Sequence, residues 1–266
     1  MSPLVIDVRN AEDPRDVVHR AVQAISEGGL VAFPTETVYG LAARALDTSA
    51  VGRLLDIKGR PANNPLALAI RGSDELSDYV PDASPLARRL ARRCWPGPVT
   101  LVLDDSHPES LIWQLPSAVQ RAVSPDKTVG LRVPGHSLIL DVLRMIAGPV
   151  VLTSANRSGE PEASSAAEIV ATFGDEVALV LVQFGLETLE QGEGIRRCAR
   201  KSSQHFAVVQ LANLASRPFD HDIAQSDLSI ATNGHLHTRR RCTPNTENGR
   251  AVKCFHGIGL GRVLGF

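Results

Sequence analysis

The chain has 266 residues, of which 43% are hydrophobic and 21% charged, a composition typical of soluble globular proteins. No apolar run approaches the roughly 18 residues of a membrane-spanning helix, so a membrane protein is not expected. The net charge of −1 is unevenly spread: residues 1–185 carry 17 Lys and Arg against 22 Asp and Glu, and residues 186–266 carry 11 against 7. A basic C-terminal part could contact nucleic acid, although a solvated tail is the simpler interpretation.

The N-terminus and the cysteines bear on the cellular compartment in which the protein is expected. No basic segment precedes an apolar one at the N-terminus, so no secretory signal is expected. Four cysteines lie scattered, without a pairing pattern, at Cys94, Cys198, Cys242 and Cys254. Both features predict a reduced, cytoplasmic protein.

The first elements are a strand and a helix. Residues 5–8 alternate in polarity as a strand does, and Asp13-Pro14 places a proline in the first turn of a helix. Gly28-Gly29 ends this helix, because glycine adopts the left-handed cap conformation cheaply. The apolar run at 30–33 then predicts a core strand.

A polar segment follows this strand directly. Pro34 cannot donate to a sheet, so the strand ends there or lies at an edge. Thr35, Thr37 and Tyr39 offer hydroxyl groups, and Gly40 allows a close backbone approach. An ordinary turn with threonine caps is the alternative to a binding loop.

Cations and amides follow the next helix. Residues 50–57 carry a helical apolar face, and Lys58 and Arg60 come at its C-terminal end. Cations there suit the helix dipole, so a capped helix end is one explanation. Because Asn63 and Asn64 come next, we also consider a phosphate or carboxylate site.

The central part alternates helices and strands. We expect strands at 67–70, 99–103 and 129–133 and helices at 74–79 and 84–94, while residues 104–126 show the least pattern. Arg132 falls inside one of these strands, where a buried arginine needs a partner. We interpret it as a group that faces a cavity and binds an anion.

A second polar segment ends a later strand. The strand at 150–153 leads into Ser154 and Asn156, and a helix at 166–173 and a strand at 179–182 follow. Ser164 or Ser165 can cap this helix, whose free amides form a potential anion site. For Ser165 we expect a plain cap.

Five sequence blocks occur in order along the chain. They are Phe33-Pro-Thr-Glu-Thr-Val-Tyr-Gly-Leu41, Lys58-Gly-Arg-Pro with Asn63-Asn-Pro-Leu66, Trp95-Pro-Gly-Pro-Val-Thr100, Val129-Gly-Leu-Arg-Val-Pro134 and Thr153-Ser-Ala-Asn-Arg-Ser-Gly159. Together they resemble the YrdC/Sua5 family of threonylcarbamoyl-adenylate synthases, from about Gly28 to Phe173. The resemblance implies an α/β fold, with a YrdC-like twisted mixed β-sheet flanked by helices and a concave basic cavity. We expect a catalytic domain at 1–185 and a divergent, poorly ordered extension at 186–266.

The resemblance also implies an activity and its site. Family members make threonylcarbamoyl-AMP and pyrophosphate from L-threonine, bicarbonate and ATP, for the t6A modification of tRNA. Mapped onto this sequence by motif, the catalytic residues are Lys58 and Arg60. The threonine site is Thr37, Arg132 and Ser154, and the ATP site is Lys58, Arg60, Asn64, Thr128, Asn156 and Ser164. Mg²⁺ is expected to arrive with ATP, without ligands from protein side chains.

The sequence departs from the family in two places. Ala69 stands where a histidine is common, and no Ser-Thr-Val-Val segment follows Val182 to close the nucleotide site. The histidines and cysteines of the tail lack the spacing of a zinc site. Further partners implied by the resemblance are tRNA or double-stranded RNA and a downstream t6A transferase complex. A non-catalytic RNA-binding module is the alternative function, and a carbamoyl transferase is less favoured because its companion segments are missing.

Overall fold

The computed structural model describes residues 2–59, 64–182, 207–211, 228–232 and 235–237. Its strands are β1 Leu4–Asp7, β2 Val31–Phe33, β3 Gly40–Arg44, β4 Ala67–Ala69, β5 Val99–Asp104, β6 Thr128–Arg132, β7 Val150–Ser154, β8 Leu179–Val182, β9 Ala207–Leu211, β10 Leu228–Thr232 and β11 His235–His237. The helices are α1 Pro14–Ser26, α2 Thr48–Lys58, α3 Leu76–Tyr79, α4 Pro85–Cys94, α5 Ser117–Val123, α6 Ser137–Met145 and α7 Ala166–Phe173. Short 3-10 turns lie at Val8–Asn10, Ser73–Glu75, Leu111–Gln114 and Gly174–Glu176.

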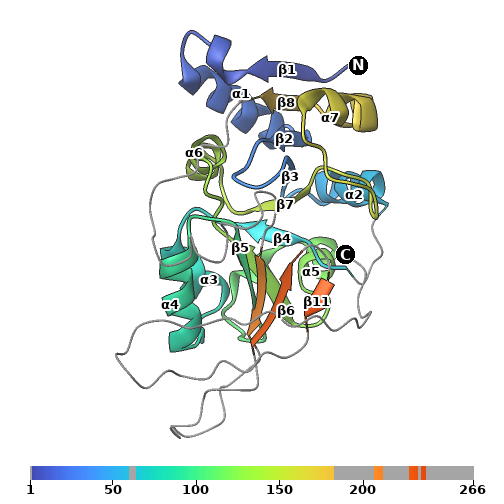
Figure 1. Ribbon diagram of the computed structural model, residues 1–266. Coiled ribbons are helices and arrows are strands. Elements are labelled where there is room, and N and C mark those ends of the chain that lie inside the picture. Colours follow the sequence, from blue (N-terminus) through green and yellow to red (C-terminus); the bar gives the residue numbers. More distant parts are fainter. Residues whose placement is uncertain (1, 60–63, 183–206, 212–227, 233–234, 238–266) are drawn as a thin grey trace, which may run out of the picture.

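All described strands belong to one mixed sheet, in the order β1-β8-β2-β3-β7-β4-β6-β5-β9-β10-β11. β1 and β2 pair with β8 in parallel, as β4 does with β6, whereas β3 and β4 pair with β7 antiparallel. The sheet twists strongly, so that β5 and β6 run across the direction of β1 and β8 (Figure 1). The predicted α/β fold with a twisted mixed sheet is confirmed.

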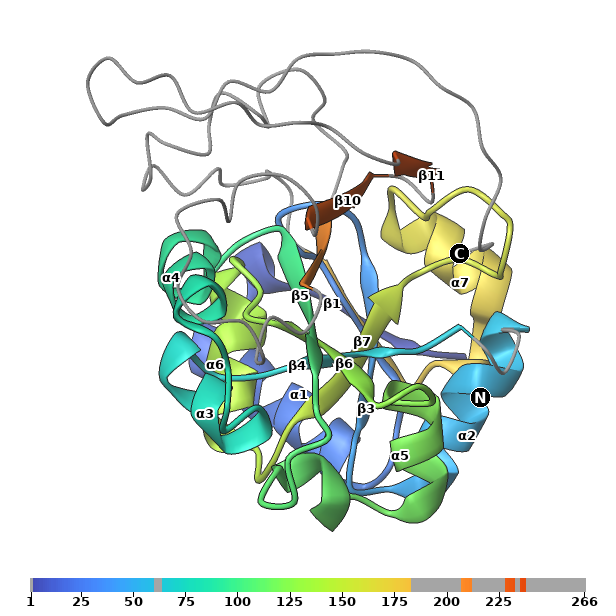
Figure 2. The same cartoon turned by 90° about the horizontal axis from the view of Figure 1, so that it is seen from below.

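Helices cover both faces of the sheet. On one face, α1 and α6 pack against side chains of β2, β7 and β8. Val31 and Phe33 are the residues of β2 on this face. On the other face, α2, α5 and α7 cover Ala32, Leu41 and Leu68. Figure 2 shows the two helical layers on either side of the strands. Successive residues of β2 enter different cores because side chains alternate along a strand.

Local sequence signals set where the helices begin. Asp13, Asp47, Ser84 and Ser165 stand at N-caps, and each side chain accepts a hydrogen bond from a backbone N–H of the first turn. The C-terminal end of α2 is capped by Gly59 in the left-handed conformation, with φ of 57°. The plain cap expected for Ser165 is confirmed.

Several elements differ from the sequence expectation. The strand β3 and the helices α5 and α6 were not predicted, and α5 lies in the stretch with the least pattern. From residues 186–266, β9 to β11 extend the sheet, and β9 pairs with β5 in parallel. The division of the chain at residue 185 stays a prediction, and the expected poor order of the extension concerns residues that are mostly outside those described. Within the described residues, no helix combines the length and hydropathy needed to cross a membrane.

Candidate active site

The loop between β2 and β3 folds back on itself through threonine hydroxyls. Thr35 Oγ1 donates to the carbonyl oxygen of Val38 at 2.7 Å and accepts from the backbone N–H of Thr37 at 3.2 Å. The hydroxyl oxygens of Thr35 and Thr37 lie 3.0 Å apart, and both side chains are buried. The loop is therefore held by its own side chains, and Thr37 is fixed in place.

Arg132, at the end of β6, meets this loop. Its Nη2 donates to Glu36 Oε1 at 2.5 Å and to Thr37 Oγ1 at 3.4 Å, and its Nε donates to the carbonyl oxygen of Gly97 at 3.3 Å. The second oxygen of Glu36 accepts from the backbone N–H of Gly135 at 2.9 Å. The expectation that a buried arginine needs a partner is confirmed, because Glu36 supplies a carboxylate.

Lys58, the last residue of α2, is joined to the end of β7. Its side chain is 2% exposed, and Nζ donates to the carbonyl oxygen of Ser154 at 2.7 Å and to Asn156 Oδ1 at 2.8 Å. Ser154 Oγ donates to the same Asn156 oxygen at 2.6 Å, and Asn156 Nδ2 donates to the carbonyl oxygen of Glu160 at 2.7 Å. Three predicted site residues therefore form one hydrogen-bonded group.

The loop at 34–40 connects the two groups. Gly40 pairs with Ser154 across the β3–β7 ladder, and the backbone N–H of Ala155 donates to the carbonyl oxygen of Tyr39 at 2.8 Å. A Cβ on Gly40 would lie 2.9 Å from a methyl group of Leu152, so the predicted close approach is confirmed. One loop thus holds Thr37 against Arg132 and its own end against the Lys58 group.

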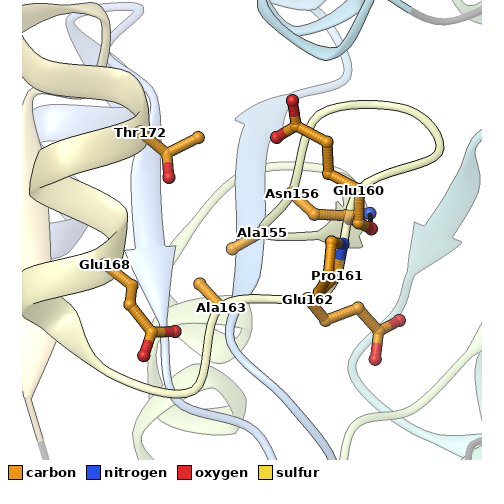
Figure 3. Close-up of a pocket in the computed structure, with 8 residues that line it drawn as sticks. All are labelled: Ala155, Asn156, Glu160, Pro161, Glu162, Ala163, Glu168 and Thr172. Atoms are coloured by element: carbon orange, nitrogen blue, oxygen red, sulfur yellow. Dashed lines mark hydrogen bonds between the residues drawn. The ribbon is translucent and has the colours of Figure 1, made fainter.

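A pocket of about 260 Å³ opens beside Asn156. It lies between α7 and the segment at 155–163, as Figure 3 shows, and is lined by Ala155, Asn156, Glu160, Pro161, Glu162, Ala163, Glu168 and Thr172. Hydrogen bonds from the backbone N–H and the hydroxyl of Ser164 lower the pKa of the Glu168 carboxyl. This wall of the pocket is acidic, and the basic character expected of the cavity stays a prediction.

Arg157 ties the walls of this region together. Nη1 donates to the carbonyl oxygen of Ile57 at 2.9 Å, and Nη2 to the carbonyl oxygen of Thr172 at 3.1 Å. The guanidinium also pairs with Glu176 at 3.0 Å and lies 5.6 Å from the ring centre of Phe173. The arginine thereby fixes the end of α2, which carries Lys58, relative to α7.

The remaining predicted site residues are Arg60, Asn64, Thr128 and Ser164. Asn64 is buried and follows the undescribed residues 60–63, so the predicted Arg60 lies outside the description. Thr128 opens β6 opposite Asp104, and among the described residues no side-chain hydrogen bond joins it to another predicted site residue. Ser164 donates its hydroxyl to Glu168, which lines the pocket.

Sequence reasoning did not single out Glu36 or Arg157. Both lie inside blocks that carried the family resemblance, and a buried Arg132 already called for an unnamed partner. Nothing in the local pattern indicates that Glu36, 96 residues away along the chain, would be that partner. The assigned roles of all predicted site residues stay predictions.

Comparison with known proteins places this chain in a family. The Sua5/YciO/YrdC family model, described as telomere recombination, matches residues 23–199. A threonylcarbamoyl-AMP synthase of Pyrococcus abyssi is 40% identical over 158 residues, which cover 59% of this chain and 44% of that protein. One of Chromohalobacter salexigens is 32% identical over 194 residues, which cover 70% of this chain and all (100%) of the relative.

A solved structure agrees with these matches. The crystal structure of P. abyssi Sua5 complexed with L-threonine aligns with a TM-score of 0.62 and 30% identity, over 81% of this chain and 56% of that one. The chain thus spans less than half the length of the P. abyssi synthase that it matches, at 44%. On the family match, which extends over both groups of site residues, this chain belongs to the Sua5/YciO/YrdC family.

Proposed function

We propose that this chain forms threonylcarbamoyl-AMP and pyrophosphate from L-threonine, bicarbonate and ATP, for the t6A modification of tRNA. The observation that carries the proposal is the connection of the Lys58–Ser154–Asn156 group to the Arg132–Thr37 pair through one loop. Relatives with the name threonylcarbamoyl-AMP synthase, and a structural neighbour complexed with L-threonine, support it.

The proposed reaction requires that the substrates be aligned and that the negative charge of the phosphates be neutralised. In the proposed step, an oxygen of the threonine carbamate attacks the α-phosphorus of ATP, and the bond from that phosphorus to the pyrophosphate oxygen breaks. The protein supplies no nucleophile, so catalysis depends on alignment and on neutralising the leaving group. Lys58 and Arg60 are proposed to hold phosphate oxygens. Because Lys58 Nζ is bonded to Asn156 Oδ1, phosphate binding would exchange that contact for a stronger charge-assisted one.

The amino acid is proposed to bind at the other end of the loop. Arg132 would receive the threonine carboxylate, and Thr37 and Ser154 would offer hydroxyl groups to the polar atoms of the substrate. Thr37 already contacts the Arg132 guanidinium, and its burial favours interactions that exclude water. Ala69, in place of the family histidine, would leave one contact to threonine unmade.

The nucleotide is proposed to lie toward the pocket beside Asn156. Asn64, Thr128, Asn156 and Ser164 are its proposed contacts. Since Glu168 stays ionised, this wall would repel phosphates and accept hydrogen bonds from ribose hydroxyl or amino groups. We therefore expect the sugar or base at the pocket and the phosphates toward Lys58.

Mg²⁺ belongs to the proposal as part of the ATP substrate. The ion supplies charge neutralisation on the phosphates and keeps several water ligands in sites of this kind. In the described ranges, no group of three or more His, Cys, Asp and Glu residues is arranged to hold a metal. Residues of this chain would act on the phosphates rather than on the ion.

Transfer to tRNA, direct RNA binding, a downstream t6A transferase complex and a cytoplasmic location are also proposals. The alternative of a non-catalytic module that binds double-stranded RNA or tRNA makes an opposite prediction. Such a module would bind RNA in a salt-sensitive way and would release no pyrophosphate.

The test is incubation of the full chain with L-threonine, bicarbonate and Mg-ATP. We expect pyrophosphate release that requires both threonine and bicarbonate, together with a threonine-containing adenylate detected by mass spectrometry. L-Serine in place of threonine is the matched control for recognition of the methyl group. Pyrophosphate release that is the same with and without threonine would contradict the proposal, as would the absence of any pyrophosphate release.

A further inference from the structure

We propose that Glu36 is a positioning residue that orients Arg132 so that only Nη1 of the guanidinium meets the carboxylate of the amino acid. This inference rests on the proposed function, in which Arg132 receives the threonine carboxylate. It assigns a task to a residue of the β2–β3 loop that has no direct part in the proposed chemistry.

The hydrogen bonds around Arg132 define its free edge. Nε is used by the carbonyl oxygen of Gly97, and Nη2 by Glu36 and Thr37. In the part of the chain that the structure describes, Nη1 donates no hydrogen bond. A guanidinium is planar with its five N–H donors in fixed directions, so these contacts also fix where Nη1 points. A substrate carboxylate would therefore accept hydrogen bonds from Nη1 alone, instead of binding two guanidinium nitrogens in a bidentate way.

Glu36 is held in place beside Arg132 by further contacts. Its second oxygen accepts from the backbone N–H of Gly135, and a Cβ on Gly135 would lie 3.4 Å from Cγ and Cδ of Glu36. The side chains of Glu36 and Arg132 are only 13% and 10% exposed. If a substrate displaced Glu36, a buried carboxylate would lose both partners, which is strongly unfavourable. Substrate therefore adds to the ion pair instead of replacing it.

The proposal is tested with Glu36→Gln. The amide keeps the volume but has one acceptor oxygen, so its NH₂ group must face either Gly135 N–H or Arg132 Nη2, both donors. We expect the KM for L-threonine to rise about tenfold, while the KM for ATP and kcat stay within about threefold. Isothermal titration calorimetry of L-threonine, which needs no turnover, should show the same loss of affinity.

The matched control is Glu75→Gln. Glu75 pairs with Arg71 outside the site, and its side chain is 12% exposed, much like that of Glu36, so Glu75→Gln should leave threonine affinity unchanged. If Glu36→Gln does not fold, Glu36→Asp supplies a second variant, because the shorter carboxylate keeps its charge but cannot bridge Arg132 Nη2 and the Gly135 N–H as Glu36 does. It should raise the threonine KM and leave the ATP KM as it is.

Three outcomes overturn the inference. Equal losses for threonine and ATP in Glu36→Gln would mean that Glu36 only supports the fold. Unchanged threonine affinity in a variant of an active wild type would remove the inference and leave the proposed function intact. A wild type that neither binds L-threonine nor releases threonine-dependent pyrophosphate would contradict both.

Discussion

Arg157 donates a hydrogen bond from Nη1 to the carbonyl oxygen of Ile57 at 2.9 Å, next to Lys58 at the end of α2. The same guanidinium donates to the carbonyl oxygen of Thr172 near the end of α7. The C-terminal ends of both helices carry partial negative charge, so one cation stabilises two helix ends at once. This arrangement makes Arg157 a structural support of the site.

Arg157→Met tests this support. The methionine keeps part of the apolar stem but loses every hydrogen bond, and we expect the free energy of unfolding to fall by about 1–3 kcal/mol. Urea denaturation followed by circular dichroism measures it. Arg144→Met is the control, because Arg144 is 62% exposed and, among the described residues, pairs with Asp141 alone, on its own helix. We expect a loss of about 0.5 kcal/mol or less there. Equal losses in the two variants would contradict the two-helix role.

Lys58→Ala removes the cation at the centre of the hydrogen-bonded group. We expect threonine-dependent pyrophosphate release to fall by about two orders of magnitude or more, since both phosphate binding and the position of Asn156 depend on the ammonium. The assay is a coupled pyrophosphate measurement, with circular dichroism to verify the fold. Arg20→Ala, at an exposed position of α1, is the control and should retain activity. Near-normal product from Lys58→Ala would reject its role.

Two glycines of the α2 region form a matched pair. Gly59 has φ of 57°, and a Cβ there would meet no atom of the described residues within 4 Å, so we expect Gly59→Ala to act through backbone strain. We expect a loss of about 1–2 kcal/mol in unfolding free energy. Gly52 lies inside α2, where a new Cβ would also have no neighbour within 4 Å in the part of the chain that the structure describes, and Gly52→Ala should stabilise the fold by about 0.5–1 kcal/mol. Chemical denaturation of both variants checks the opposite signs, and equal signs would contradict the left-handed cap.

Asp105 predicts a pH dependence of stability. It is 0% exposed, and its carboxylate oxygens have no hydrogen-bond partner among the described residues. Burial raises the pKa of this carboxyl, and the nearby Ser124 hydroxyl opposes the shift without reaching hydrogen-bond geometry. Because the folded state holds the proton more tightly than the unfolded state, stability is lost as the pH rises from the unfolded pKa, about 3.9, through the folded pKa.

Asp105→Asn removes this penalty with a neutral side chain of equal size. We expect the variant to be more stable than the wild type at pH 7 by about 1 kcal/mol, and the difference to vanish below about pH 4. Urea titrations between these values measure it. Asp78→Asn, at an exposed position of α3, is the control and should show no such trend. A difference that does not change with pH would contradict the assignment.

The sequence predicted the elements with strong local signals. The helices α1, α4 and α7 begin with side-chain caps, and the apolar runs of β2 and β8 are continuous. The strand β3 was not predicted, because Gly-Leu-Ala-Ala-Arg has little β propensity and is a strand only through pairing with β2 and β7. Such tertiary effects do not appear in a local pattern.

The candidate site divides in the same way. The motif blocks indicated Thr37, Lys58, Arg132, Ser154 and Asn156, and the structure brings them together in two connected groups. Which side chains would bond to which could not be predicted, since that depends on which strands become neighbours in the sheet and in which register. The Glu36–Arg132 pair and the bond from Arg157 to Ile57 join residues about 100 positions apart, beyond the reach of a local pattern.

The hydrogen bonds of the site join residues that are far apart in the chain: 96 positions separate Glu36 from Arg132, and 98 separate Lys58 from Asn156. Closing such long loops is entropically costly and slow, so these contacts are expected late in folding, after the central strands have paired. During synthesis on the ribosome, the Arg132 group needs the chain only as far as Gly135, whereas the Lys58 group stays incomplete until β7 and the segment after it have emerged. A nascent chain that ends before Asn156 would therefore carry the Arg132 group without the Asn156 partner of Lys58 Nζ.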